Sequence, residues 1–454
     1  MTTRPRLLSP EEAEKKTRFL YYWLLLVLFF EYARPASYIP PLGALPLNSA
    51  LPLGLTAVCF FAPGLRPVSE IFKDRMARWP LVFIGFILLS MGYAEVSMRA
   101  FTVFELVLGY VFLFWIIARI VTTEQRLRGV FLTLIFCHIF LLAMNPEVVL
   151  DPNNRNYIRG ASFLGDGNDF SLSLCILMPL AMLSALQSSG MRRMFYWGVM
   201  GLLLLAIIGT QSRGATLGIA SVFGYLWLQS NRKALGVVGV MLAVLVVLIY
   251  APPVYFQRMG TITNYENESS AEGRIHAWKA GTKMALHNPL GVGAGNFPNS
   301  FPKYRSDDAP VRWMTAHSMY FLILGELGIL GLLLLLKLIF GNVAENARLR
   351  KVLTERATGP PQDGVDPQTV ADNLKHSVLW LRFMNASMFG FAVAGAFLSV
   401  AYYPHIFVLT GLMISTRAIM ATRNGMDMAV LQAPAGKVRR RVAAGVQRRP
   451  ASGA

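Results

Sequence analysis

Three side chains that could take part in chemistry stand where an otherwise apolar chain has little reason to carry them. Arg213 interrupts an apolar stretch, between LLLLAIIGTQS and GATLGIASVFGYLWL. Arg274 lies in a long polar segment, and His317 comes just before the apolar run MYFLILGELGILGLLLLL. A charged side chain at membrane depth costs at least about 2.5–3.5 kcal/mol, so it usually faces a cavity or a partner. These three positions are therefore candidates for one shared site.

Two arginines and one histidine suit the transfer of a sugar from a lipid-diphosphate donor. Arginine binds phosphate oxygens through paired hydrogen bonds and keeps its charge. Histidine, with an ordinary pKa of about 6.5, can take the proton from an attacking sugar hydroxyl. Simpler alternatives stay open. Arg213 could snorkel to the outer surface and His317 could be structural, while Arg274 could anchor its helix at the membrane interface together with Trp278.

The other polar motifs predict neither a metal site nor a nucleotide site. His276, His287 and His317 form no HxxxH pair, and the three cysteines lie in apolar runs without paired spacing. The glycines of GVGAGN, residues 291–296, do not follow a strand or open a helix, as a dinucleotide-binding loop would. They are better explained as a turn that ends a helix, although exposed amides of such a turn can assist an anion.

The elements that must position these residues are apolar helices. The chain has 454 residues, of which 54% are hydrophobic and 15% charged, and its mean hydropathy is +0.46. A bilayer core of about 30 Å requires about 20 apolar residues in a helix. The sequence therefore predicts an all-α polytopic membrane protein with about twelve transmembrane helices. These lie near residues 19–31, 45–62, 79–94, 101–121, 128–145, 168–187, 194–210, 212–229, 235–251, 317–340, 377–399 and 404–422.

The distribution of charge predicts the orientation of these helices. The net charge of +18 would fit nucleic-acid binding, but the basic residues are concentrated in short loops such as RPVSEIFKDRMAR and ARIVTTEQRLR. If the chain starts in the cytoplasm and crosses at each run, these loops lie inside, which is the positive-inside pattern. We therefore expect both termini in the cytoplasm and no nucleic-acid partner.

The same topology divides the chain into segments. We expect a cytoplasmic N-terminus that is not a cleavable signal, nine helices, a long external loop, three further helices and a basic cytoplasmic tail. The tail is expected to anchor the topology or contact anionic membrane lipids. In order, these segments are residues 1–18, 19–251, 252–316, 317–422 (with a cytoplasmic loop at 341–376) and 423–454.

The external loop, residues 252–316, is predicted to contain an amphipathic helix at about 270–287. Ser269 and Glu272 have the spacing of a capping box, and proline and glycines follow the helix. Ile275, Trp278, Thr282 and Ala285 recur on one face of this helix. This helix would lie at the outer membrane interface or pack over the bundle.

Four motifs between residues 155 and 340 resemble the O-antigen ligase and O-antigen polymerase superfamily of bacterial envelope enzymes. In chain order they are IRGASFLGDGNDFSLSL, TQSRGATLG, EGRIHAWKAGTKMALHNPLGVGAGNF and AHSMYFLILGELGILGLLLL. Ser318 stands where many relatives have asparagine, so a role of that side chain does not carry over. Together the four motifs are specific for the superfamily but separate its members poorly.

The resemblance implies an inverting glycosyltransferase of the bacterial inner membrane that needs no metal and no cofactor. Its donor would be a glycan on undecaprenyl diphosphate, and its active site would lie at the periplasmic face, under the 252–316 loop. His317 would be the catalytic base, and Arg213 and Arg274 would bind the donor diphosphate. Arg159 and His276 are further candidates for substrate binding.

The acceptor distinguishes the members of this superfamily. A ligase would use a sugar of lipid A–core, a polymerase another lipid-linked repeat unit, and a related oligosaccharyltransferase a protein hydroxyl. We favour the ligase, in lipopolysaccharide biosynthesis, over a polymerase of O-antigen or exopolysaccharide. A non-enzyme alternative is a polysaccharide or lipid transporter, which would place charges near the midplane and show paired halves. The sequence does not indicate the oligomeric state.

Overall fold

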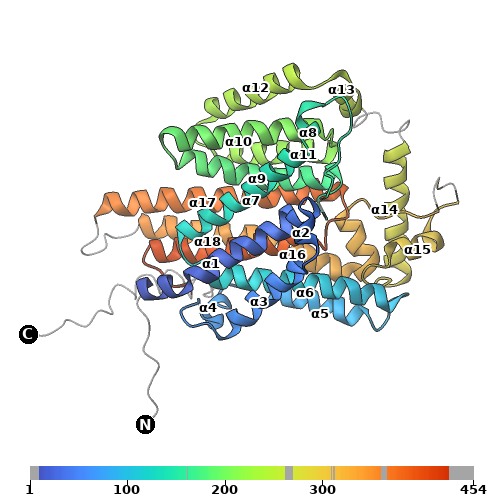
Figure 1. The fold of residues 1–454 in the computed structure, drawn as a ribbon, viewed down its shortest axis with the longest axis horizontal. Helices are drawn as coiled ribbons and strands as arrows, with labels where there is room; N and C mark the ends of the chain where they lie inside the picture. The colour runs from blue at the N-terminus through green and yellow to red at the C-terminus, as the bar shows by residue number, and fades with distance from the viewer. Residues whose placement is uncertain are drawn as a thin grey trace, which may run out of the picture.

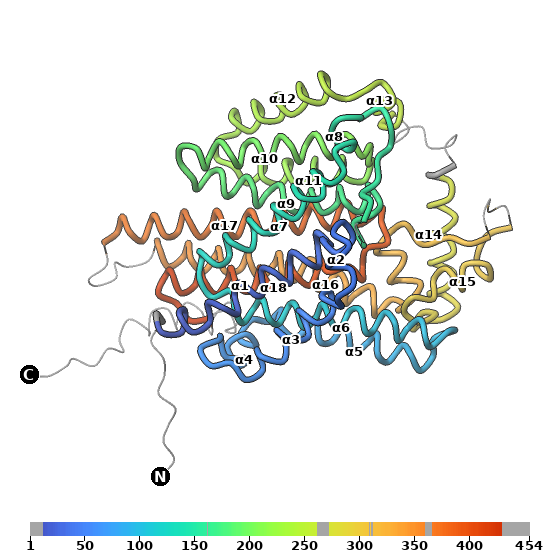
Figure 2. Tube along the Cα trace, viewed as in Figure 1, coloured from blue at the N-terminus to red at the C-terminus, as the bar shows by residue number. Residues whose placement is uncertain are grey.

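The computed structural model describes residues 10–160, 162–260, 269–307, 309, 312–358 and 366–428. These residues form α-helices and short 3-10 turns, and none of them lies in a β-strand. The long helices run side by side in one bundle, and α14 (Ser269–His287) stands across one end of it (Figures 1 and 2). The predicted all-α, polytopic fold is confirmed.

Every apolar run that was predicted to span the membrane forms a helix. Among the described residues, eight helices are long and apolar enough to cross: α6 (Ser97–Ile120), α7 (Glu124–Met144), α9 (Gly167–Leu186), α10 (Gly190–Gly209), α12 (Lys233–Tyr250), α16 (Met319–Ala357), α17 (Pro367–Ala394) and α18 (Pro404–Arg423). The other four runs form α1 (Pro10–Ala33), α3 (Leu47–Phe61), α5 (Trp79–Ser90) and α11 (Arg213–Gln229). At about 1.5 Å per residue, α3 and α5 reach only about 22 and 18 Å. Length and composition thus support eight crossings, fewer than the twelve predicted.

Successive connections between the helices alternate between the two ends of the bundle. The segments predicted to lie inside meet at the end opposite α14, where Lys73 binds Asp427 with an Nζ–Oδ distance of 3.1 Å. At the same end the Glu124 carboxylate accepts hydrogen bonds from His376 (2.8 Å) and Arg423 (3.3 Å). This arrangement fits a chain that crosses repeatedly, and its orientation in the membrane remains a prediction.

Small residues allow the inner helices to pack closely. The helices α9, α17 and α18 are largely buried, whereas the apolar residues of α12 are exposed. A Cβ at Gly214 of α11 would lie 3.2 Å from Phe397 Cβ, and one at Gly218 would lie 3.0 Å from Ala394 Cβ. Helices in a membrane associate through such close packing, because lipid removes the hydrophobic drive between them.

A buried ion pair joins three parts of the bundle at the end opposite α14. The guanidinium of Arg417 on α18 donates to both carboxylate oxygens of Asp74, at 2.6 and 3.1 Å. Asp74 follows α4 (Val68–Ile71). The remaining Arg417 donors bind the side-chain oxygens of Asn342 (3.0 Å) and Asn346 (2.8 Å) on α16. Arg417 and Asp74 are both almost completely buried, so each charge depends on the other.

The external loop contains α13 (Pro253–Gly260), α14 and α15 (Phe297–Tyr304). The amphipathic helix was predicted to lie at the outer membrane interface or to pack over the bundle, and α14 packs over the bundle against α16. The ring of Trp278 stacks on Phe321 with centroids 5.2 Å apart. A Cβ at Gly281 would lie 3.0 Å from the Phe321 carbonyl oxygen, so the two helices are in close contact.

The buried face of α14 differs in part from the predicted one. Ile275, Trp278 and Ala285 are partly buried and Thr282 is exposed. The fully buried side chains are those of His276, Ala277, Ala280 and Met284. Gly281 lies where the backbone of α14 comes close to α16, so this position is determined by small size. Apolar periodicity alone could not identify it.

The predicted cytoplasmic loop 341–376 is largely helical. α16 continues through this segment to Ala357, and α17 begins at Pro367; the loop motif GPPQDGV at 359–365 lies outside the described residues. The extension is polar, and Glu345 pairs with Arg348 one turn later, at 3.7 Å. Such i,i+3 pairs support a helix beyond the end of its apolar part.

Candidate active site

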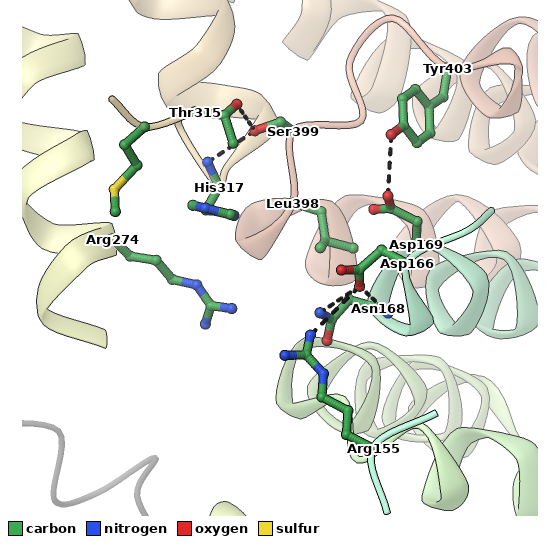
Figure 3. Close-up of a pocket in the computed structure, with 11 residues that line it drawn as sticks. Arg155, Asp166, Asn168, Asp169, Arg274, Thr315, His317, Leu398, Ser399 and Tyr403 are labelled. Atoms are coloured by element: carbon green, nitrogen blue, oxygen red, sulfur yellow. Dashed lines mark hydrogen bonds and ion pairs between the residues drawn. The ribbon is translucent and has the colours of Figure 1, made fainter. Parts of the chain in front are cut away.

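A cavity of about 530 Å³ lies at the α14 end of the bundle (Figure 3). Four segments that are far apart in the sequence form its wall: residues 155–169, α14, residues 314–317 and residues 398–403. The lining residues are Arg155, Asp166, Asn168, Asp169, Arg274, Met314, Thr315, His317, Leu398, Ser399 and Tyr403. The cavity therefore contains two of the three residues on which the sequence hypothesis rests.

His317 lies on this wall, two residues before α16 begins. Its backbone has a φ of 46°, in the left-handed region that residues other than glycine seldom adopt. The backbone N–H donates to Ser399 Oγ at 2.9 Å. Burial lowers the pKa of His317 below its ordinary value, the positive charge of Arg274 lowers it further, and Asp166 opposes both. The imidazole is therefore neutral at pH 7 and able to accept a proton.

Arg274 reaches the cavity from the N-terminal half of α14. Figure 3 shows its side chain extending from the helix toward the open space on which His317 also borders. The positive charge of Arg274 lowers the pKa of His317, so the two side chains are close enough to interact electrostatically. Arg274 and His317 thus border one cavity, and the functional role of each remains a prediction.

Arg213 does not line the cavity. It is the first residue of α11, where Ser212 caps the helix by accepting a hydrogen bond from Ala215 N at 3.3 Å. Gln211 before it has a φ of 52°, and its side chain donates to the carbonyl oxygen of Pro152 at 2.8 Å. In this structure the TQSRG element ties α11 to the 151–166 segment. The proposed contact of Arg213 with a diphosphate stays a prediction.

Arg159 and His276 are not among the lining residues either. The Arg159 side chain is 85% exposed, and its Nε is 3.8 Å from a carboxylate oxygen of Glu147. His276 is buried in the inner face of α14, and its Nδ1 forms a hydrogen bond with Ser306 Oγ at 2.7 Å. His276 thus connects α14 to the segment around Ser306 in the external loop. The substrate contacts of Arg159 and His276 stay predictions.

Acidic and polar residues of the 155–169 segment form the wall that the sequence argument missed. Asp166 is the N-cap of α9 and accepts hydrogen bonds from the backbone N and the side-chain Nδ2 of Asn168, at 2.7 and 2.8 Å. Arg155 Nη2 lies 3.7 Å from Asp166. The motif GDGNDF was noticed as part of the family resemblance, but nothing in it indicated that these side chains face His317.

Asp169 and Tyr403 complete this wall. The Tyr403 hydroxyl donates to Asp169 Oδ2 at 3.2 Å, across 234 residues of chain. Burial and the Asp169 carboxylate both raise the pKa of Tyr403, so the phenol stays protonated and serves as a donor. Tyr403 lies far beyond the four motifs, and no local signal distinguishes it in the sequence.

The lining divides the cavity by charge. Arg274 and His317 border one part, and Asp166 and Asp169 border another, with Arg155 beside Asp166 (Figure 3). Carboxylates repel phosphate and accept hydrogen bonds from sugar hydroxyls, whereas an arginine attracts phosphate.

Within the described part of the chain, no three His, Cys, Asp or Glu side chains come together in a metal-binding arrangement.

The glycine turn after α14 donates hydrogen bonds to a carboxyl group of the protein itself. The buried carboxylate of Glu326 on α16 accepts hydrogen bonds from Gly295 N (2.8 Å), Phe297 N (2.9 Å) and the Tyr402 hydroxyl (2.7 Å). The backbone of the turn also donates to α16, from Gly293 N to the Glu326 carbonyl oxygen at 2.8 Å. The GVGAGNF motif of the turn and the ELG motif of α16 thus bind each other through these hydrogen bonds.

Two glycines permit this contact. Gly328 has a φ of 64° and interrupts α16, and a Cβ there would lie 2.0 Å from the Pro289 carbonyl oxygen. A Cβ at Gly291, which has a φ of 83°, would lie 2.3 Å from the Glu326 carbonyl. Both positions require glycine for its conformation and for the close approach. The kink fixes the external loop to the helix that follows His317.

Residues 198–336 match the family model described as O-antigen ligase. The match includes Arg213, Arg274 and His317, and it ends before Ser399 and Tyr403. It supports the resemblance to the O-antigen ligase and polymerase superfamily, whose members are membrane glycosyltransferase-like enzymes. No curated protein matches the chain.

Proposed function

We propose that this chain, with its O-antigen ligase match over residues 198–336, is a ligase that transfers a glycan from undecaprenyl diphosphate to a sugar hydroxyl of lipid A–core. The observation that carries the proposal is that Arg274 and a His317 of lowered pKa border one cavity. We place this cavity at the periplasmic face of the inner membrane, because the basic loops lie at the opposite end of the bundle.

The transfer would be a single displacement. His317 takes the proton of the acceptor hydroxyl as its oxygen attacks the anomeric carbon of the donor. The new C–O bond forms as the bond from the anomeric carbon to the diphosphate oxygen breaks, so the configuration inverts. Undecaprenyl diphosphate leaves with the electron pair, and Arg274 stabilises its charge.

The division of charge in the cavity orients the two substrates. The diphosphate is attracted toward Arg274 and repelled by the Asp166 carboxylate. The sugar hydroxyls can bind the carboxyl groups of Asp166 and Asp169, and the Tyr403 hydroxyl lies beside them as a further polar group. His317, next to Arg274 and under the influence of Asp166, is then placed between leaving group and acceptor.

The non-enzyme alternative receives less support from this arrangement. A transporter would hold its substrate near the midplane, between two halves of the bundle. This cavity is lined by loops and helix ends, together with α14, at one end of the bundle.

The test is an assay of purified protein with a lipid-linked O-antigen donor and lipid A–core acceptor. His317→Ala should reduce kcat by about 100- to 10,000-fold, the contribution of a general base, while the protein still inserts and folds. Retention of the wild-type rate in this variant would refute the assignment of the base.

Deletion of the gene distinguishes the acceptors. Loss of O-antigen from lipopolysaccharide, with lipid-linked polymer still present, indicates the ligase. A single-repeat band indicates the polymerase, which uses the same chemistry on a second lipid-linked unit. Unchanged lipopolysaccharide indicates that the glycan is a different one.

A further inference from the structure

We infer that Ser399 is a positioning residue for His317, an inference that rests on the proposed function. Ser399 lies between the 3-10 turn Gly395–Phe397 and α18, outside the residues matched by the family model. Its hydroxyl reaches 82 residues back along the chain to the backbone of His317. Nothing in the motif resemblance extends this far.

The hydroxyl of Ser399 binds the chain on both sides of Ala316. Ser399 Oγ accepts a hydrogen bond from His317 N at 2.9 Å and forms a second hydrogen bond with Thr315 Oγ1 at 2.8 Å. These contacts hold residues 315–317 against the connection between α17 and α18 (Figure 3). The residues just before α16 are therefore held by a residue of the segment that connects α17 to α18.

The conformation of His317 explains why such support is needed. With a φ of 46°, its backbone is in a region that an L-residue keeps only when its surroundings enforce it. Without the Ser399 hydroxyl, His317 N–H loses this acceptor and the backbone can relax toward the ordinary extended region. The imidazole would then turn away from the reacting hydroxyl, and a displacement of about 1 Å can cost about 100-fold in rate.

Two residues that follow Ser399 also form hydrogen bonds to segments around the cavity. Tyr402 binds Glu326 and Tyr403 binds Asp169, at 2.7 and 3.2 Å. The short segment 398–403 thus contacts the kink of α16, the acidic wall and the backbone of His317. Ser399 is the member of this segment whose hydrogen bonds lead directly to the proposed base.

The test compares Ser399→Ala and Ser399→Thr with a matched control. Ser399→Ala should lower kcat at least about tenfold and leave the KM of donor and acceptor within about twofold, because only the placement of the base changes. Ser399→Thr keeps the hydroxyl and should recover most of kcat. Ser415→Ala removes another buried serine hydroxyl, 16 residues further on in α18, and should behave as wild type.

A double variant separates positioning from a direct contact with substrate. In the His317→Ala background, Ser399→Ala should cause no further loss, because Ser399 acts only through His317. A wild-type kcat in Ser399→Ala would overturn the inference. So would a rise in KM with unchanged kcat, or an additional loss in the double variant.

A second measurement does not depend on the transfer reaction. Diethyl pyrocarbonate modifies neutral imidazole, and its rate at His317 can be followed by mass spectrometry of the peptide. Ser399→Ala should change this rate several-fold, whereas Ser399→Thr and Ser415→Ala should not; an unchanged rate in Ser399→Ala would overturn the inference. A changed rate in a protein that transfers no glycan would leave the positioning intact and refute the proposed function.

Discussion

The protonation of His317 sets the pH range in which this side chain can act as a base. Only neutral imidazole accepts a proton, and burial together with Arg274 lowers the pKa of His317 below the ordinary value of about 6.5. We therefore expect kcat/KM to fall as the pH drops through this lowered pKa and to be level at neutral pH. The pH profile of the purified enzyme, measured with stable substrates, provides the test.

Charge and hydrogen-bonding geometry at Arg274 can be separated by two substitutions. Arg274→Gln removes the positive charge, so the pKa of His317 rises and the acid limb of the profile moves to higher pH. Arg274→Lys keeps the charge and should leave the limb in place, but its rate should fall because an ammonium lacks the planar fork. An acid limb that stays in place in Arg274→Gln would contradict the proposed electrostatic contact.

Asp169 should affect the acceptor rather than the donor diphosphate. An ordinary hydrogen bond contributes about 0.5–1.5 kcal/mol, so Asp169→Asn should raise the acceptor KM by about 2- to 10-fold. Tyr403→Phe removes the hydroxyl that is hydrogen-bonded to Asp169 and should have a weaker effect in the same direction. Donor KM should change little in both variants, and a larger change in donor KM than in acceptor KM would contradict the assignment.

The contact between the glycine turn and α16 depends on one buried carboxylate. Glu326→Ala leaves the amides of Gly295 and Phe297 and the Tyr402 hydroxyl without this acceptor. Each buried donor left unpaired costs about 1–3 kcal/mol, so the turn should open locally before the bundle unfolds. Hydrogen exchange should be faster at residues 291–297 and unchanged in α9, while equal exchange in both proteins would show that the carboxylate does not hold the turn.

The long helices could be predicted from the sequence because each one carries its own signal. Each of the twelve apolar runs forms a helix, although only eight of the described helices are long and apolar enough to cross a membrane. Capping and glycine signals placed α14 within one residue of its observed bounds. Two details escaped this reasoning. The inner face of α14 combines small residues such as Gly281 with the larger His276 and Met284, and α16 itself continues as a charged helix beyond its apolar part.

Only two of the eleven residues that line the cavity, His317 and Arg274, could be predicted, because they were unusual for their local surroundings. Asp169, Ser399 and Tyr403 were not, since their relevance comes from contacts across 82 and 234 residues. Arg213 was equally unusual as a charge, yet the fold places it outside the lining. Local chemistry thus indicates which residues are exceptional, and only the packing of the helices decides which of them meet.

The buried pair of Arg417 and Asp74 should control the stability of the bundle without taking part in the reaction. It lies at the end opposite the cavity, and both side chains are almost completely buried. Removal of one partner leaves an uncompensated charge, which costs about 3–5 kcal/mol, so Arg417→Met and Asp74→Leu should each markedly lower the thermal unfolding midpoint in detergent. The double variant should be more stable than either single variant, because no charge is left unpaired. Additive losses in the double variant would mean that the two side chains stabilise the bundle independently.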